Sequence, residues 1–214
     1  STEDPLDVAF STDGLQVFSA NTKMESPKGK GNLSMNRLLR PFDMTSIKRD
    51  NGDLSCDVID SFKVGNLAGD GSKQLGNIVV ADEGSKFFFA NTSGKIYRFD
   101  LTTPNEFSTA TFVQSVTPHS QVHGIAFSDD GTRLFTIRWT DETPLVTTYQ
   151  LPSPYDISSI TQIHQVDLTD IGVTLPDTSN DSINRARDIE FSKSGHAMFV
   201  SVSYTHLRAH ETYT

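Results

Sequence analysis

His206 and His210 are the residues that first suggest chemistry in this sequence. They lie four positions apart in the segment Thr205-His-Leu-Arg-Ala-His-Glu211. On a helix this spacing places two imidazoles on one face, as in zinc hydrolases, and raises the hypothesis of a metal site. The hypothesis depends on which elements would position the two side chains.

Those elements begin with a phrase that recurs four times. In each copy a short apolar run meets a turn that ends in Gly, and a second apolar run follows. The copies start at Leu6, Gly76, His123 and Arg187, and their turn glycines are Gly14, Gly84, Gly131 and Gly195. Each copy predicts a β-hairpin: Asp13-Gly14 and Asp130-Gly131 are typical of type I′ turns, with weaker versions at Glu83-Gly84 and Ser194-Gly195.

A second phrase follows the first three hairpins, with the pattern Leu-x-x-Pro-x-acid-apolar-Ser/Thr-Ser/Thr. It starts at Leu38, Leu101 and Leu151. An alternating segment precedes it and an apolar segment follows it, which predicts a third and a fourth strand. Proline suits the connection between them because it fixes φ and needs no acceptor for an amide proton.

Each unit is therefore predicted to be a four-stranded antiparallel sheet. One such sheet cannot bury both of its faces, so neighbouring sheets must stack around an axis. We predict an all-β fold, an incomplete β-propeller whose blades cover about 6–62, 75–116, 123–168 and 187–201. A β-sandwich with irregular hairpins is the alternative, and the fixed order of two recurring phrases disfavours it.

The predicted blades are too few to close a typical propeller ring. About three and a half blades are fewer than the roughly 4–8 of a typical propeller. The sequence also begins at Ser1 rather than at Met. We therefore expect the chain to be a fragment of a longer protein.

The tail after Ser201 resembles none of the other units. Val202–Thr212, VSYTHLRAHET, looks like one reading frame of the mosaic end and adaptor of transposase-based sequencing libraries. This resemblance implies that residues 202–214 are an artefactual tail on a metagenomic reading frame. His206 and His210 are then not a site, and we predict no metal, no cofactor and no catalytic residue in the chain.

Composition narrows the class of partner. The formal net charge of −9 opposes non-specific binding to nucleic acid and to anionic lipid. No apolar run approaches the roughly 20 residues that a membrane-spanning helix needs, so we expect no membrane insertion. Cys56 is the single cysteine, which excludes an internal disulfide. We expect a protein or glycan surface as partner, and the oligomeric state stays open.

A ligand site is predicted where the innermost strands begin, because propellers usually bind ligands near the central channel. His123 precedes the first strand of its unit, and the loop between the second and third strands should reach the same face. The residues that would line this polar pocket are His123, Arg138, Trp139, Arg185, Arg187 and Asp188. The alternative, which we favour, is that these side chains only solvate loops.

The acidic turns raise a separate question. Asp129-Asp130-Gly131 and Asp82-Glu83-Gly84 could suggest calcium, but carboxylates with Gly also suit tight hairpins, and no EF-hand pattern follows. We interpret both segments as turns. His164 and His196 are predicted to be surface residues.

The paired phrases resemble a repeat family of marine phage and bacterial proteins. Its repeats have the form G-L-x-F-x-x-D-G-T-K-M-Y followed by Y-x-L-S-T-P-W-D-V-S-T-A, and Gly124–Phe135 with Tyr149–Thr161 match them well. The resemblance implies a non-enzymatic binding or structural propeller, part of a phage virion (tail) protein or a bacterial surface protein. It favours a virion, extracellular or cell-surface location.

The alternative is a fragment of a propeller enzyme, such as a lactonase-like hydrolase with a metal in its channel. Such an enzyme needs several ligands that converge from successive innermost strands. The equivalent starting pairs are Leu6-Asp7, Gly76-Asn77, His123-Gly124 and Arg187-Asp188. This mixed set does not have the composition of a metal cage, so we expect no enzyme.

Overall fold

The computed structural model of the chain describes residues 3–23, 30–46, 60–63, 75–91, 93–140, 143–172 and 186–202. These residues contain no α-helix, and none of their helical turns is long and apolar enough to cross a bilayer. Their strands form three four-stranded antiparallel sheets and one two-stranded sheet, in which neighbours in sequence are neighbours in space.

The four sheets are the blades of an incomplete β-propeller. The first three blades are β1 (Glu3–Phe10), β2 (Gln16–Lys23), β3 (Lys30–Arg37) and β4 (Asp60–Lys63); β5 (Leu75–Ala81), β6 (Lys86–Asn91), β7 (Ile96–Leu101) and β8 (Ala110–Val116); and β9 (Gly124–Phe127), β10 (Arg133–Thr140), β11 (Thr143–Gln150) and β12 (Thr161–Asp167). Blade 4 comprises β13 (Ala186–Phe191) and β14 (Met198–Val202).

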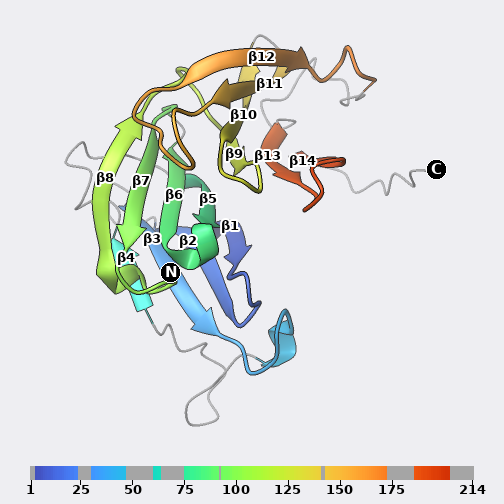
Figure 1. The fold of residues 1–214 in the computed structure, drawn as a ribbon. Helices are drawn as coiled ribbons and strands as arrows, with labels where there is room; N and C mark the ends of the chain where they lie inside the picture. Colours follow the sequence, from blue (N-terminus) through green and yellow to red (C-terminus); the bar gives the residue numbers. More distant parts are fainter. Residues whose placement is uncertain are drawn as a thin grey trace.

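The blades form an open arc (Figure 1). The innermost strands β1, β5, β9 and β13 line its inner side, and the outermost strands β8 and β12 lie on its outer side. Each innermost strand starts at one end of its blade, which we call the linker face, and runs to the turn that ends in Gly, at the opposite end or turn face. The loops between the second and third strands return to the linker face, as predicted: in the register, Leu75 pairs with Asn91 and Gly124 with Ile137.

The two recurring phrases are joined by backbone hydrogen bonds, which explains their fixed order. In blade 3 the Leu151 N–H donates to the Thr132 carbonyl at 3.0 Å, and the Tyr155 N–H donates to the Gly131 carbonyl at 2.8 Å. Phe42 and Asn105 occupy the position of Tyr155 in blades 1 and 2. All three residues have a left-handed φ, between 56° and 64°, which turns the amide of each toward its glycine.

The turn glycines provide space as well as a left-handed backbone. Gly131 has φ +67°, and a Cβ placed on it would lie 2.4 Å from the Tyr155 ring. A Cβ on Gly14 would likewise lie 2.4 Å from the Phe42 ring. The glycine and the fifth residue of the Leu-x-x-Pro phrase are thus two halves of one packing contact.

The prediction of hairpins is confirmed, but the predicted turn type is wrong for Asp13-Gly14 and Asp130-Gly131. A type I′ turn needs a positive φ at both central residues, and neither aspartate has one. Each carboxylate instead accepts hydrogen bonds within its turn; the Asp130 Oδ1 atom, for example, accepts from the Ser128 hydroxyl at 2.6 Å and the Thr132 N–H at 3.0 Å. Consecutive left-handed residues occur only in blade 2 among the described turns, at Asp82 and Glu83.

The core consists of the interfaces between blades, and phenylalanine dominates it. A ring from the second strand of one blade packs against the next blade at each interface. The pairs are Phe18 with Phe107 at 4.9 Å between ring centroids, Phe88 with Phe127 at 4.4 Å, and Phe135 with Phe191 at 4.4 Å. These three pairs use six of the 14 phenylalanines in the sequence.

Candidate functional site

Three polar side chains from three different blades meet where the innermost strands begin. Asp7, Asn77 and Asp188 each stand seven residues before the turn glycine of their unit. The Asn77 Nδ2 atom donates to the Asp7 Oδ2 atom at 2.9 Å and to the Asp188 Oδ1 atom at 2.8 Å. We call these three residues the axial cluster.

The axial cluster also ties side chains to the backbone of the next blade. The Ile78 N–H donates to the Asp7 Oδ2 atom at 2.7 Å, and the Ile125 N–H donates to the Asn77 Oδ1 atom at 2.9 Å. Asp7 and Asn77 thus each satisfy an amide that the following blade would otherwise bury without a partner. A buried amide left without a partner costs about 1–3 kcal/mol, so these contacts fix blade 2 against blade 1 and blade 3 against blade 2.

Gly124 occupies the fourth axial position and breaks the series. Without a side chain it cannot reach blade 4, and the Ile189 N–H donates instead to the carboxylate of its own neighbour Asp188, at 2.8 Å. A Cβ on Gly124 would lie 2.7 Å from the Asp188 Cα atom. Glycine therefore allows blade 4 to approach closely enough for Asp188 to reach Asn77.

The electrostatics of the axial cluster favour a proton on Asp188. Burial, and then the negative charge of Asp7, raise the pKa of Asp188 to about 7. Burial also raises the pKa of Asp7, although hydrogen bonds from the Ile78 and Val8 amides oppose this. Two carboxyl groups in one poorly solvated place do not both ionise readily, so the pair holds a proton near neutral pH.

A second group of titratable side chains is formed by His119, Tyr149 and Arg138. The Tyr149 hydroxyl is hydrogen-bonded to the His119 Nε2 atom. Burial, and then the positive charge of Arg138, lower the pKa of His119 to about 4. His119 is therefore neutral at physiological pH and accepts or donates a hydrogen bond without carrying charge.

The structure distributes the six predicted site residues over different surroundings. Asp188 is in the axial cluster and Arg138 is beside His119. His123 is buried, and its backbone N–H donates to the Ile137 carbonyl at 2.9 Å. Arg187 is exposed on β13. Trp139 lies in β10, but its side chain, like the whole of Arg185, lies outside the described residues.

Asp7 and Asn77 were not among the predicted site residues. The signal that could have found them was present, because both share the spacing of Asp188 from a turn glycine. His164 and His196 are exposed, as predicted. His206 and His210 lie outside the described residues, and within the described ranges no group of three His, Cys, Asp or Glu side chains is placed to hold a metal.

Comparison with known proteins supports the fold alone. No family model and no curated protein matches the chain. Among solved structures, it is similar to 6-phosphogluconolactonase-like proteins of Bacteroides fragilis (12% identity, TM-score 0.55, 92% of this chain and 47% of that one) and Bacteroides uniformis (19%, 0.52, 94% and 50%). It is also similar to Sqt1 of Chaetomium thermophilum (10%, 0.53, 92% and 41%).

These similarities cover only part of each solved chain. The present chain spans half or less of the length of each of them. Because the three similar proteins are distant in sequence and differ from one another, they indicate a propeller fold and leave function to the site itself.

Proposed function

We propose that the chain is part of a non-enzymatic binding or structural propeller that recognises a protein or glycan. The observation that carries this proposal is the use of the axial side chains. Asp7 and Asn77 are engaged by the backbone of the following blade, and Asp188 is engaged by Asn77 and by the Ile189 N–H. Groups used in this way hold the blades together and are poorly placed to attack a substrate.

The linker face is the surface that we assign to recognition. Arg187 is exposed there at the start of β13. Side chains of this type contribute strongly to protein interfaces because guanidinium groups make several directed hydrogen bonds. A place in a phage virion (tail) protein or a bacterial surface protein rests on the resemblance of the repeat.

A lactonase-like hydrolase is the second candidate, and one observation favours it. A carboxyl group with a pKa of about 7, as in Asp188, is suited to general acid–base catalysis at neutral pH. Two of the similar solved structures are 6-phosphogluconolactonase-like. In that case Asp188 would exchange a proton with a substrate at the axis.

One pair of assays separates the two functions. We expect the biotinylated chain to bind components of a glycan array or a bacterial surface extract, and Arg187→Glu to weaken binding at least tenfold. Lys193→Glu, on the turn face, is the matched control and should leave binding unchanged. Hydrolysis of 6-phosphogluconolactone that exceeds the buffer rate and is abolished by Asp188→Asn would favour the enzyme and contradict the proposal.

A further inference from the structure

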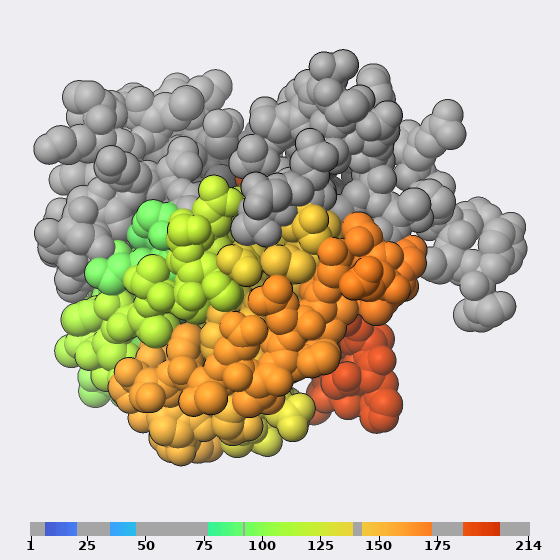
Figure 2. All heavy atoms as spheres, turned by 90° about the horizontal axis from the view of Figure 1, so that it is seen from above, coloured from blue at the N-terminus to red at the C-terminus, as the bar shows by residue number. Residues whose placement is uncertain are grey.

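An open groove of about 750 Å³ separates blades 3 and 4 on the turn face. Arg133 and Phe135 line it from blade 3, and Phe191 and Gly195 line it from blade 4. In Figure 2 a notch is visible between the red atoms of β13–β14 and the yellow and orange atoms of blade 3. This groove is distant along the blades from the linker face and plays no part in the function proposed above.

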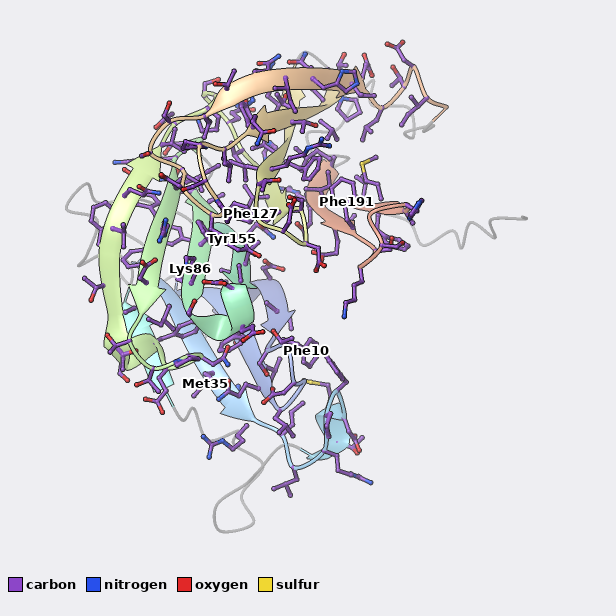
Figure 3. The ribbon with its side chains drawn as sticks, viewed as in Figure 1. Phe10, Met35, Lys86, Phe127, Tyr155 and Phe191 are labelled. Carbon is purple, nitrogen blue, oxygen red and sulfur yellow. The ribbon has the colours of Figure 1, made fainter. Side chains whose placement is uncertain are left out.

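The corresponding place between blades 2 and 3 is filled by Tyr155. Its ring centroid lies 5.5 Å from that of Phe127 and 6.3 Å from that of Phe88, and the Lys86 Nζ atom lies 6.0 Å from it. The Arg98 Nη1 atom donates to the Tyr155 carbonyl at 3.0 Å. Figure 3 shows Lys86, Tyr155 and Phe127 grouped between the two blades, with Phe191 farther along the arc.

The groove carries the same contact residues one blade later. Arg133 stands two residues after its turn glycine, as Lys86 does, and Phe135 stands four residues after it, as Phe88 does. Phe191 stands four residues before its glycine, as Phe127 does. The geometry is conserved too: Phe135 and Phe191 cross at 41° and Phe88 and Phe127 at 45°, each pair with centroids 4.4 Å apart.

Gly195, beneath the groove, has the backbone geometry of Gly131 but no ring of the described residues packed on it. Gly195 has φ +71°, close to the +67° of Gly131, and its N–H donates to the Ser192 carbonyl at 2.7 Å, as that of Gly131 does to Ser128. Tyr155 covers Gly131, whereas no atom of the described chain lies within 4 Å of the Cβ position on Gly195. The groove therefore has counterparts of the residues that contact the Tyr155 ring between blades 2 and 3, and among the described residues it lacks the ring itself.

We propose that this groove binds a peptide segment of the type Leu-x-x-Pro-aromatic-acid, supplied by another repeat. The aromatic ring lies on Gly195 between Arg133 and Phe191, and the amide of the same residue donates to the Gly195 carbonyl. The acidic residue that follows reaches His164, since Asp156 accepts from Gln114 at 3.1 Å and Gln114 occupies the register position of His164. The two internal contacts in which a ring covers the turn glycine, Phe42 on Gly14 and Tyr155 on Gly131, define the chemistry of the ligand.

The test uses the chain and a synthetic peptide with the sequence of Leu151–Ser159, LPSPYDISS, labelled with fluorescein. Fluorescence anisotropy should show saturable binding of this peptide. A peptide with Tyr155→Ser should bind at least tenfold more weakly, because it lacks the ring. Hydrogen exchange should show that only the first peptide protects the amides of residues 192–197.

Protein variants locate the site. Arg133→Glu should weaken binding of the peptide at least fivefold. Lys95→Glu, which reverses a charge in the β6–β7 loop on the opposite face, should not change it. Equal binding of the two peptides, or no saturable binding, would overturn the proposal. So would sedimentation showing a dimer of the chain that excludes the peptide, because a second copy would then fill the groove.

Discussion

Met44 and Phe107 occupy the same position of the repeat in blades 1 and 2, yet their surroundings are opposite. Phe107 is fully buried, with its ring 4.9 Å from that of Phe18 in the preceding blade. Met44 is 48% exposed, and Phe42 beside it is 61% exposed. The residue type at this position is apolar in both blades, so the neighbouring blade, rather than the blade itself, determines its burial.

Blade 4, at the other end of the arc, also exposes an apolar residue that is packed in the other blades. Phe18, Phe88 and Phe135 stand four residues after their turn glycines, and each packs against the next blade. Phe199 has this position in blade 4 and is 60% exposed. Both ends of the arc thus carry the apolar side chains of an interface, and contiguous apolar surface of this kind marks a site of association.

The largest expected effect comes from emptying an occupied interface. Phe107→Ala should lower the free energy of unfolding by about 3–5 kcal/mol, because it leaves a cavity against Phe18. Met44→Ala, at the same repeat position, should lower it by less than about 1 kcal/mol. Urea unfolding of both variants measures the difference. Similar losses for the two would show that the first blade is covered in solution.

Next in size is the contrast between a covered and an uncovered turn glycine. Gly131→Ala should cost about 2–4 kcal/mol, because the new methyl group meets the Tyr155 ring and the backbone keeps a left-handed φ. Gly195→Ala has the backbone cost alone, about 1 kcal/mol. Thermal unfolding at matched protein concentration compares them. A larger loss for Gly195→Ala would mean that the groove is already filled.

Asp188 gives a smaller effect that depends on pH. Its pKa rises from an ordinary value of 3.8 to about 7 on folding, so the folded state binds the proton more tightly. The resulting stability is complete below the unfolded pKa and is lost as the pH rises through about 7. Asp188→Asn should therefore remove most of this slope and raise stability at pH 8 by roughly 2 kcal/mol.

The control for this prediction is Asp130→Asn. The pKa of Asp130 is lowered to about 2 by hydrogen bonds within its turn, which is a shift of opposite sign. Its replacement should leave the slope between pH 5 and 7 unchanged, because Asp130 is ionised in both states over this range. Urea unfolding across this range decides the matter, and a slope that survives in Asp188→Asn would assign the proton to another group.

The smallest expected effect is on the exposed face of blade 1. Leu39 is 67% exposed, so Leu39→Lys should change the free energy of unfolding by no more than about 0.5 kcal/mol. It should instead reduce self-association, measured by light scattering as a function of protein concentration. Unfolding caused by this single charge would show that Leu39 is buried in solution.

The sequence was sufficient to predict the blades, because each blade repeats a local pattern of hairpin and connection. Turn type was harder to predict: Asp-Gly pairs such as Asp13-Gly14 and Asp130-Gly131 are typical of type I′ turns. Here neither aspartate has a positive φ, and each carboxylate accepts hydrogen bonds within its turn. The sequence shows that the residues of the axial cluster share one repeat position, but it does not show that their side chains are in contact. Asp7 is separated from Asn77 by 70 residues and Asn77 from Asp188 by 111, and only the curvature of the arc brings them together.

Gly124 also has a mechanical consequence. Because it offers no side chain at the axis, Asp188 bypasses blade 3 there and bonds to Asn77 of blade 2, which also bonds to Asp7 of blade 1. A force that opens the arc from its two ends would load this one amide group from both sides. Within the axial cluster, the Asn77 side chain is therefore the one link that joins three blades.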